Sequence, residues 1–140
     1  MNSQANKELV RRLYDLLNGG DVEGVGELVT RDYEEHDPLP GQGTGREGVI
    51  DRFTMIVEAL APHFTVEDLI AEDDKVVVRW TNAGTHVAPF AGAPATGRSF
   101  TIAGIDIYRV AAGSLCEHWH VIDQLSMLGQ LGLLPEPATT

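Results

Sequence analysis

The segment 117–123 brings together several side chains that could do chemistry. It reads Glu-His-Trp-His-Val-Ile-Asp and runs from a strand pattern into a short apolar helix. Because strand side chains alternate between two faces, Trp119 and Asp123 are expected on one face and His118 and His120 on the other. The first face then places a carboxylate near a large aromatic ring. Such surroundings disfavour the anion and can make a carboxylic acid a useful base.

Asp123 has two interpretations that the residues leave open. A base that takes a proton next to a carbonyl must reach the carbon acid within a pocket, and Asp123 fits this role if it points into one. It also precedes the apolar segment 124–131, and aspartate is favoured at the residue that caps a helix. Capping would favour the anion and oppose the basic role.

The histidines offer further chemistry. His36 precedes a turn-rich stretch, where a neutral imidazole could donate a hydrogen bond to an enolate oxygen or simply bond the loop. His118 faces away from Asp123, so it contacts the opposite layer or a neighbouring subunit unless a bulge redirects it. His118 and His120 share a face and form a usable metal pair. Zinc needs a third converging ligand, which His36 or His86 would have to supply from that face, and we expect no metal site.

Size and charge limit the class of protein. The 140 residues suit one domain, which we expect to span 1–140 with its core at about 5–134. A formal net charge of −11 without a basic run argues against binding nucleic acid or an anionic membrane. The single cysteine, Cys116, forms no intrachain disulfide and is expected in the core. No signal peptide is evident and no stretch approaches the roughly 20 apolar residues of a membrane span, so a cytoplasmic location is expected.

The hydrophobic spacing predicts helices first and long strands afterwards. Apolar periodicity predicts helices over 5–17, 22–29, 44–61 and 124–131, and extended segments over 32–36, 64–71, 76–86, 98–110 and 115–123. This order indicates an α+β fold. Three N-terminal helices lying across a strongly curved antiparallel sheet of four or five strands, with a short C-terminal helix, would leave a pocket between the layers. Such pockets commonly bind small molecules.

Several large side chains are candidates for the wall of this pocket. Trp80 and Trp119 either stack on a planar ligand or belong to the core. Tyr14 lies on the inner stripe of the first helix and either packs there or offers its hydroxyl to the pocket. Phe53 belongs to a helix stripe that packs on the sheet and can double as pocket lining.

The residues also resemble a known family. The run Glu117-His118-Trp119, then Asp123, then 128–132 (Leu-Gly-Gln-Leu-Gly) resembles the C-terminal signature of the SnoaL-like polyketide cyclases. Four further segments are similar to that family, in the expected order: 33–38, 84–86, 95–98 and 104–110. Together they cover the chain from about residue 9 to 134. One departure is His120, where family members often have Asp or another residue.

The resemblance implies a fold and an activity. The fold would be the cone-shaped α+β barrel shared by nuclear transport factor and ketosteroid isomerase, with a pocket between the concave sheet and the helices. The activity would be an intramolecular aldol closure of the fourth ring of an aromatic polyketide methyl ester, without metal or organic cofactor. Asp123 matches the family's acid/base, and His86 and His118 match positions expected to contact the ligand. The implied partners are an apolar polycyclic substrate and further copies of the chain, as a homodimer or higher homo-oligomer.

Two other functions remain open. A related hydrolase that adds water to an epoxide, or a related isomerase, would use the same scaffold. The hydrolase needs two carboxylates with a positive residue between them, for which Asp106, Asp123 and Arg109 could be offered. Asp106 and Arg109 differ by three positions in a strand, however, and point oppositely. A non-catalytic protein that binds a small molecule or dimerises would also keep both scaffold and pocket.

Overall fold

The computed structural model describes residues 2–134. The elements follow in the order α1 (Ser3–Asn18), α2 (Val22–Gly26), β1 (Val29–Glu35), α3 (Gly45–Leu60), β2 (His63–Glu72), β3 (Lys75–Thr85), β4 (Ser99–Ala111), β5 (Ser114–Ile122) and α4 (Gln124–Leu131). The α+β prediction is therefore confirmed. Within the described residues, no helix is both long and apolar enough to cross a membrane.

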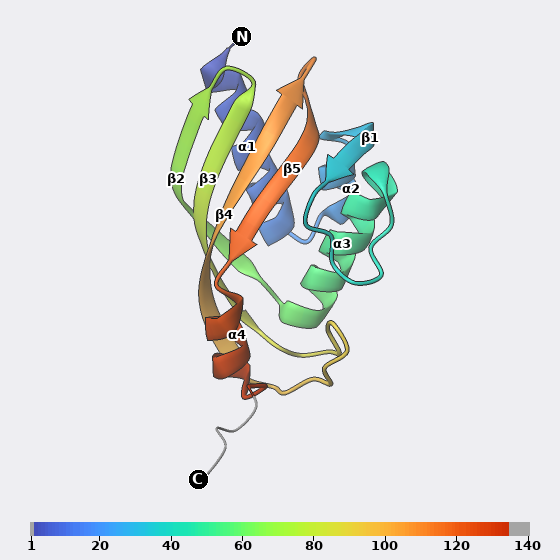
Figure 1. The fold of residues 1–140 in the computed structure, drawn as a ribbon, viewed down its shortest axis with the longest axis vertical. Helices are drawn as coiled ribbons and strands as arrows, with labels where there is room; N and C mark the ends of the chain where they lie inside the picture. Colours follow the sequence, from blue (N-terminus) through green and yellow to red (C-terminus); the bar gives the residue numbers. More distant parts are fainter. Residues whose placement is uncertain (1, 135–140) are drawn as a thin grey trace.

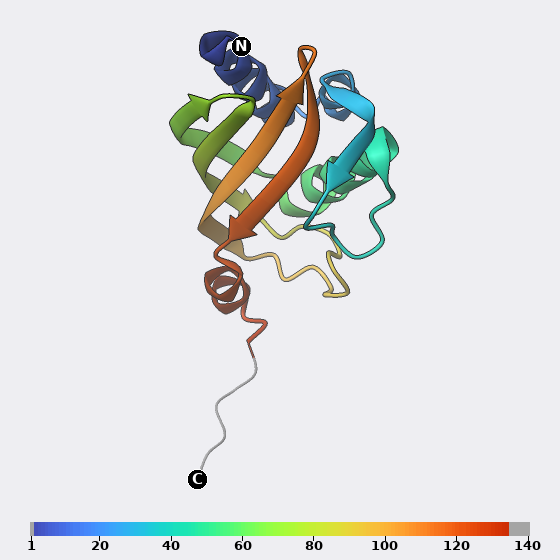
Figure 2. The same ribbon diagram turned by 45° about the horizontal axis from the view of Figure 1, so that its top comes forward.

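The five strands form one open, curved sheet in the order β1-β5-β4-β3-β2. Strands β2 to β5 form the expected antiparallel meander, whereas β1 pairs in parallel with β5, so the sheet is mixed. Figure 2 shows β1 beside β5 at the edge of the sheet. Helices flank this short strand on both sides in the sequence, so no hairpin turn predicts which strand it pairs with. Its pairing nevertheless places Glu35 opposite His118.

The first three helices lie on one face of the sheet (Figures 1 and 2). Helix α1 packs against β2, and α3 packs against β1. Alternation along β3 buries Val76, Val78 and Trp80 against these helices and leaves Arg79 exposed on the other face. Helix α4 packs against β4 at the open end of the layers.

Gly104 on β4 gives Trp80 its place on the inner face. The two residues are direct partners between β3 and β4. A Cβ atom at Gly104 would lie 2.3 Å from the Trp80 ring, so any larger residue would have to displace the indole. The glycine therefore lets the indole lie flat across β4, where its Nε1 reaches Asp106 at 2.6 Å.

The second helix is shorter than the predicted range 22–29. It ends at Gly26, and β1 begins at Val29, three residues before the predicted extended segment. Gly24 and Gly26 lower helical stability by roughly 1 kcal/mol each relative to alanine, which accounts for the early end. The predicted closing helix has the same bounds in the structure, Gln124–Leu131.

Candidate active site

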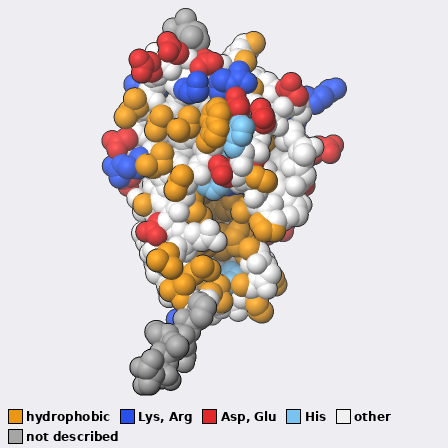
Figure 3. All heavy atoms as spheres, in the orientation of Figure 1, with side chains coloured by type: hydrophobic (Ala, Val, Ile, Leu, Met, Phe, Trp, Pro, Cys, Tyr) orange, Lys and Arg blue, Asp and Glu red, His pale blue; other side chains and the backbone are white. Residues whose placement is uncertain are grey.

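A cavity of about 720 Å³ opens between the inner face of the sheet and the helices. Figure 3 shows its mouth as a hollow lined mainly by hydrophobic side chains, with histidine atoms at its edges. Phe53, Ile56, Phe64, Ile102 and Met127 form part of the apolar wall. The volume and the apolar lining are typical of a pocket for a small organic ligand.

The predicted alternation along β5 is confirmed, but the face that lines the pocket is the opposite of the one expected. His118 and His120 line the cavity, whereas Trp119 lies on the outer face of the sheet. There the Trp119 ring stacks on His36, with 4.8 Å between centroids and 2° between planes. The structure places both residues outside the pocket lining, so it does not support the predicted ligand contact of Trp119 or the predicted enolate contact of His36.

Asp123 also lies outside the cavity. It is exposed and stands before α4, where its Oδ1 accepts the Ser126 backbone N–H at 3.1 Å. The helix-capping interpretation is thus confirmed, and the prediction that the carboxylate points into the pocket is wrong. The predicted catalytic role rested on that placement and loses its geometric support.

His118 is the centre of a buried ionic network. It is 3% exposed, and its Nδ1 lies 2.7 Å from Glu35 Oε2 while its Nε2 lies 3.0 Å from Asp106 Oδ1. A carboxylate only accepts hydrogen bonds, so both ring nitrogens donate and the ring is an imidazolium. Burial favours the neutral ring, but the two carboxylates outweigh it and raise the pKa of His118 to about 9.

Asp106 lies in the pocket wall among three hydrogen-bond donors. Its carboxylate accepts hydrogen bonds from the Tyr14 hydroxyl, the Trp80 indole N–H and His118. Burial works against the anion, but the charge of His118 and the three donors prevail, so the pKa of Asp106 lies below its ordinary value. Since the Tyr14 proton goes to Asp106, the Tyr108 hydroxyl donates to Tyr14 across 3.1 Å.

His120 lies in the pocket wall, where its environment favours the neutral ring. Its two ring nitrogens lie 3.2 and 3.4 Å from Arg52 Nη2, and its ring stacks on that of His118 at 5.4 Å. Burial lowers the pKa of His120, and the positive charges of Arg52 and His118 lower it further. Arg52 itself is buried and lies 3.7 Å from Glu35. Asp37 Oδ2 lies 3.9 Å from His120 Nδ1, so three carboxylates (Glu35, Asp37 and Asp106) and two cations surround the imidazole.

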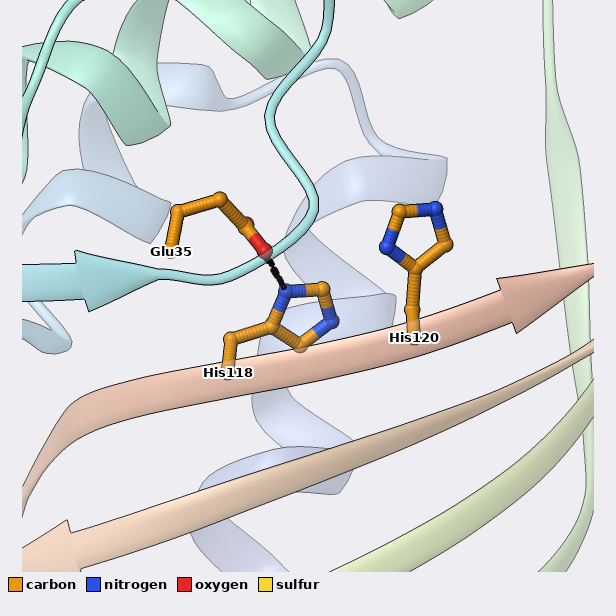
Figure 4. A group of neighbouring side chains, drawn as sticks. All are labelled: Glu35, His118 and His120. Atoms are coloured by element: carbon orange, nitrogen blue, oxygen red, sulfur yellow. Dashed lines mark hydrogen bonds and ion pairs between the residues drawn. The ribbon is translucent and has the colours of Figure 1, made fainter.

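Glu35, His118 and His120 are also positioned like metal ligands. Figure 4 shows the three side chains converging from β1 and β5, and their ligand atoms lie within 4.8 Å of one another. Arg52 already supplies the positive charge at this point, and Glu35 already holds the His118 proton. A divalent cation would have to displace the guanidinium and that proton, so this donor set does not favour a metal.

A second group of ligand-type side chains lies outside the pocket. Glu34, His36 and Glu117 gather on the outer face of the sheet. Glu117 is already paired there with Arg109 Nε at 2.6 Å. Arg109 therefore points away from Asp106, as the three-residue spacing predicts, and the set Asp106, Asp123 and Arg109 offered for an epoxide hydrolase does not come together.

Five of the predicted ligand-contacting residues do line the cavity: Tyr14, Phe53, Trp80, His86 and His118. The sequence patterns did not assign Glu35, Arg52 or Tyr108 to the site, and they offered His120 only as part of a metal pair and Asp106 only within the hydrolase interpretation. Two features of the sequence could have pointed to His120. It shares a strand face with His118, and it departs from the residue that family members often have at this position. The roles of Glu35 and Arg52 depend on the parallel pairing of β1 and had no local signal.

The fold and the pocket define a class of small, cavity-containing α+β proteins, and comparison identifies the family. The family model for SnoaL-like polyketide cyclase matches residues 7–131, and the chain belongs to this family. Aklanonic acid methyl ester cyclase DauD of Streptomyces sp. (strain C5) is 30% identical over 132 residues, covering 89% of this chain and 80% of the relative. DnrD of Streptomyces peucetius, a cyclase of the same description, is also 30% identical, covering 89% of both chains.

The solved structures agree with this assignment. TsrD from Streptomyces laurentii superimposes with a TM-score of 0.87 at 29% identity, covering 96% of this chain and 99% of that one. The cone-shaped fold that the sequence resemblance implied is thereby confirmed, with the sheet open and mixed.

Proposed function

We propose that this protein closes a ring of an aromatic polyketide methyl ester by an intramolecular aldol reaction, with His120 as the base. The support for the substrate class is the family and the two curated relatives, both described as aklanonic acid methyl ester cyclases. The observation that carries the reaction type is the neutral His120 beside the buried cation Arg52 in the wall of a large apolar pocket. Taking a proton next to a carbonyl requires such a base together with a group that stabilises the enolate.

The reaction divides between the two residues. His120 takes a proton from the carbon between activating carbonyl groups, and the electron pair of that C–H bond becomes the enolate. Arg52 shifts its N–H from the imidazole to the enolate oxygen, which frees a nitrogen lone pair for the proton. The enolate carbon then attacks a ketone of the same molecule and forms the new C–C bond. The resulting alkoxide takes the proton back from His120, so the product is an isomer of the substrate and no cofactor is consumed.

His118 acts differently from His120. Both of its nitrogens are committed to carboxylates, so it has no lone pair with which to accept a proton. Its positive charge lies beneath the His120 ring and keeps that ring neutral, as a base requires. Asp106 is a poor base for the related reason that three donors already occupy its carboxylate.

The experiment uses aklanonic acid methyl ester, the compound named for both relatives. The purified protein is dialysed against EDTA and incubated with this ester. The products are then separated, and their masses are measured by mass spectrometry. We expect a ring-closed product with unchanged mass and no oxygen from labelled water. The rate should rise with pH as His120 loses its proton, at a pKa below its ordinary value of 6.5. Binding without turnover would favour the non-catalytic function, and oxygen from water would favour the hydrolase.

We also propose that the chain forms a homodimer through the outer face of the sheet. Ile70, Val77, Ile107 and Trp119 lie in one row across β2 to β5. In the next row Val121 is 74% exposed. Figure 3 shows hydrophobic side chains gathered over these strands, and a contiguous exposed patch of this kind commonly marks an interface. Light scattering of the Val121→Lys variant should show a monomer where the unmodified protein is a dimer, and an unmodified monomer would refute the proposal.

A further inference from the structure

Two buried polar atoms in the pocket lack a partner among the described residues: Asn82 Oδ1 and His86 Nε2. Asn82 is 4% exposed and His86 is 1% exposed, and both side chains line the cavity. Buried polar groups are nearly always hydrogen-bonded, because leaving one unsatisfied is costly. A third such atom, Thr30 Oγ1, lies outside the cavity. The two pocket atoms are therefore candidates for contact with a ligand.

The proton on the His86 ring can be placed. The Thr96 backbone N–H lies 3.3 Å from His86 Nδ1, and the Thr96 hydroxyl lies 3.1 Å from the same nitrogen. Because a backbone N–H can only donate, Nδ1 is the acceptor and Nε2 carries the proton. The residues of the pocket wall thus include one unpartnered N–H donor, on His86, and one unpartnered carbonyl acceptor, on Asn82.

These two residues lie away from the ionic network. Asn82 pairs with Ile102 across β3 and β4, whereas Asp106 is four residues further along β4. At about 3.3 Å per residue along β4, Ile102 and Asp106 are roughly 13 Å apart. His86 lies just beyond the end of β3, next to Arg98. The intervening pocket wall is apolar and includes Trp80 and Ile102.

We propose that Asn82 and His86 form a recognition subsite for the ring of the substrate farthest from the reacting carbons. That ring must carry a hydrogen-bond donor for Asn82 and an acceptor for His86, which a hydroxylated, carbonyl-bearing aromatic ring supplies. The subsite deepens the proposed cyclase function and rests on it for the orientation of the substrate. A ligand with an apolar edge would leave both protein atoms unsatisfied, so the pair selects for oxygen substituents at this end.

Binding of two matched planar probes tests the subsite without turnover. 2-Hydroxyanthraquinone offers a hydroxyl and a carbonyl, whereas 2-methylanthraquinone lacks the hydroxyl and has a similar shape. Quenching of tryptophan fluorescence at pH 6, where the phenol is protonated, gives both dissociation constants. We expect the hydroxylated probe to bind about tenfold more tightly, and Asn82→Leu to remove that preference.

The control is Ile102→Val, a neighbouring pocket position without a polar side-chain atom. It should change the affinity for both probes by the same factor. His86→Leu should weaken binding of the hydroxylated probe about tenfold, and His86→Gln should recover part of the loss because its amide N–H can donate.

Equal affinity of the unmodified protein for the two probes would overturn the proposal, and so would an equal loss for both probes in Asn82→Leu. If neither Asn82 nor His86 variants fold, the comparison of probes on the unmodified protein still decides. A selective subsite in a protein without cyclase turnover would refute the proposed function while keeping the subsite. Cyclase turnover without a difference in affinity between the two probes would refute the subsite and keep the proposed function.

Discussion

The stability of the protein should fall between neutral and alkaline pH because of one residue, His118. Its pKa rises from 6.5 in the unfolded chain to about 9 in the folded protein, where Glu35 and Asp106 hold its two ring protons. A raised folded-state pKa stabilises the fold fully below pH 6.5, and this stabilisation is lost as the pH rises through about 9. At about 1.4 kcal/mol for each pH unit, the interval corresponds to about 3 kcal/mol.

Urea unfolding followed by circular dichroism measures this directly. We expect the free energy of unfolding to decrease by about 3 kcal/mol between pH 6 and pH 10. Replacement by His118→Gln removes the titrating group, so the variant should be less stable at pH 6 and should lose about 3 kcal/mol less than the unmodified protein over the same interval. The difference between the two curves isolates His118 from other groups that titrate at high pH.

A second readout does not depend on the variant being folded. In the NMR titration of the unmodified protein, one histidine Cε1–H resonance should report a pKa near 9. If every histidine titrated near 6.5, and the two stability curves ran parallel, the buried ionic network would not exist as described.

Three further substitutions test the local structure. Asp123→Ala should lower the free energy of unfolding by about 1 kcal/mol, measured in urea, because it removes the cap on the Ser126 N–H, and it should leave turnover within about twofold. Gly104→Ala should lower the melting temperature and the affinity for planar ligands together, since the added methyl group displaces Trp80 at a cost of about 1–3 kcal/mol. Asp106→Asn should lower the stability by about 3–5 kcal/mol at neutral pH and shift the His118 resonance titration downward, because the neutral amide leaves the imidazolium with one carboxylate instead of two.

Periodicity predicted most of the fold. The helix from Gln124 to Leu131 has the predicted bounds, and β2 to β5 lie within two residues of the expected segments. Alternation along β5 also correctly separated His118 and His120 from Trp119. These features depend on the local repeat of the backbone, which the order of apolar residues reveals.

The inward-facing side of β5 could not be predicted from alternation alone. Both faces of this strand carry apolar or aromatic side chains, since Trp119 lies on the outside, Ile122 lines the pocket, and Val121 is 74% exposed and also borders the pocket. The local pattern was therefore ambiguous, and a carboxylate beside a tryptophan suggested the wrong face. The deciding contact is long-range: β1 pairs in parallel with β5 and brings Glu35 onto His118. Such pairing is a property of the whole fold.

The most direct test compares two pocket assignments in one assay. Turnover of aklanonic acid methyl ester is measured for the unmodified protein, His120→Gln and Asp123→Asn, with ligand affinity measured in parallel. Since His120 lines the cavity and Asp123 is an exposed helix cap, we expect His120→Gln to lose turnover by about 10² or more while still binding ligand, and Asp123→Asn to stay within about twofold. Full activity in His120→Gln, together with a large loss in Asp123→Asn, would contradict the assignment.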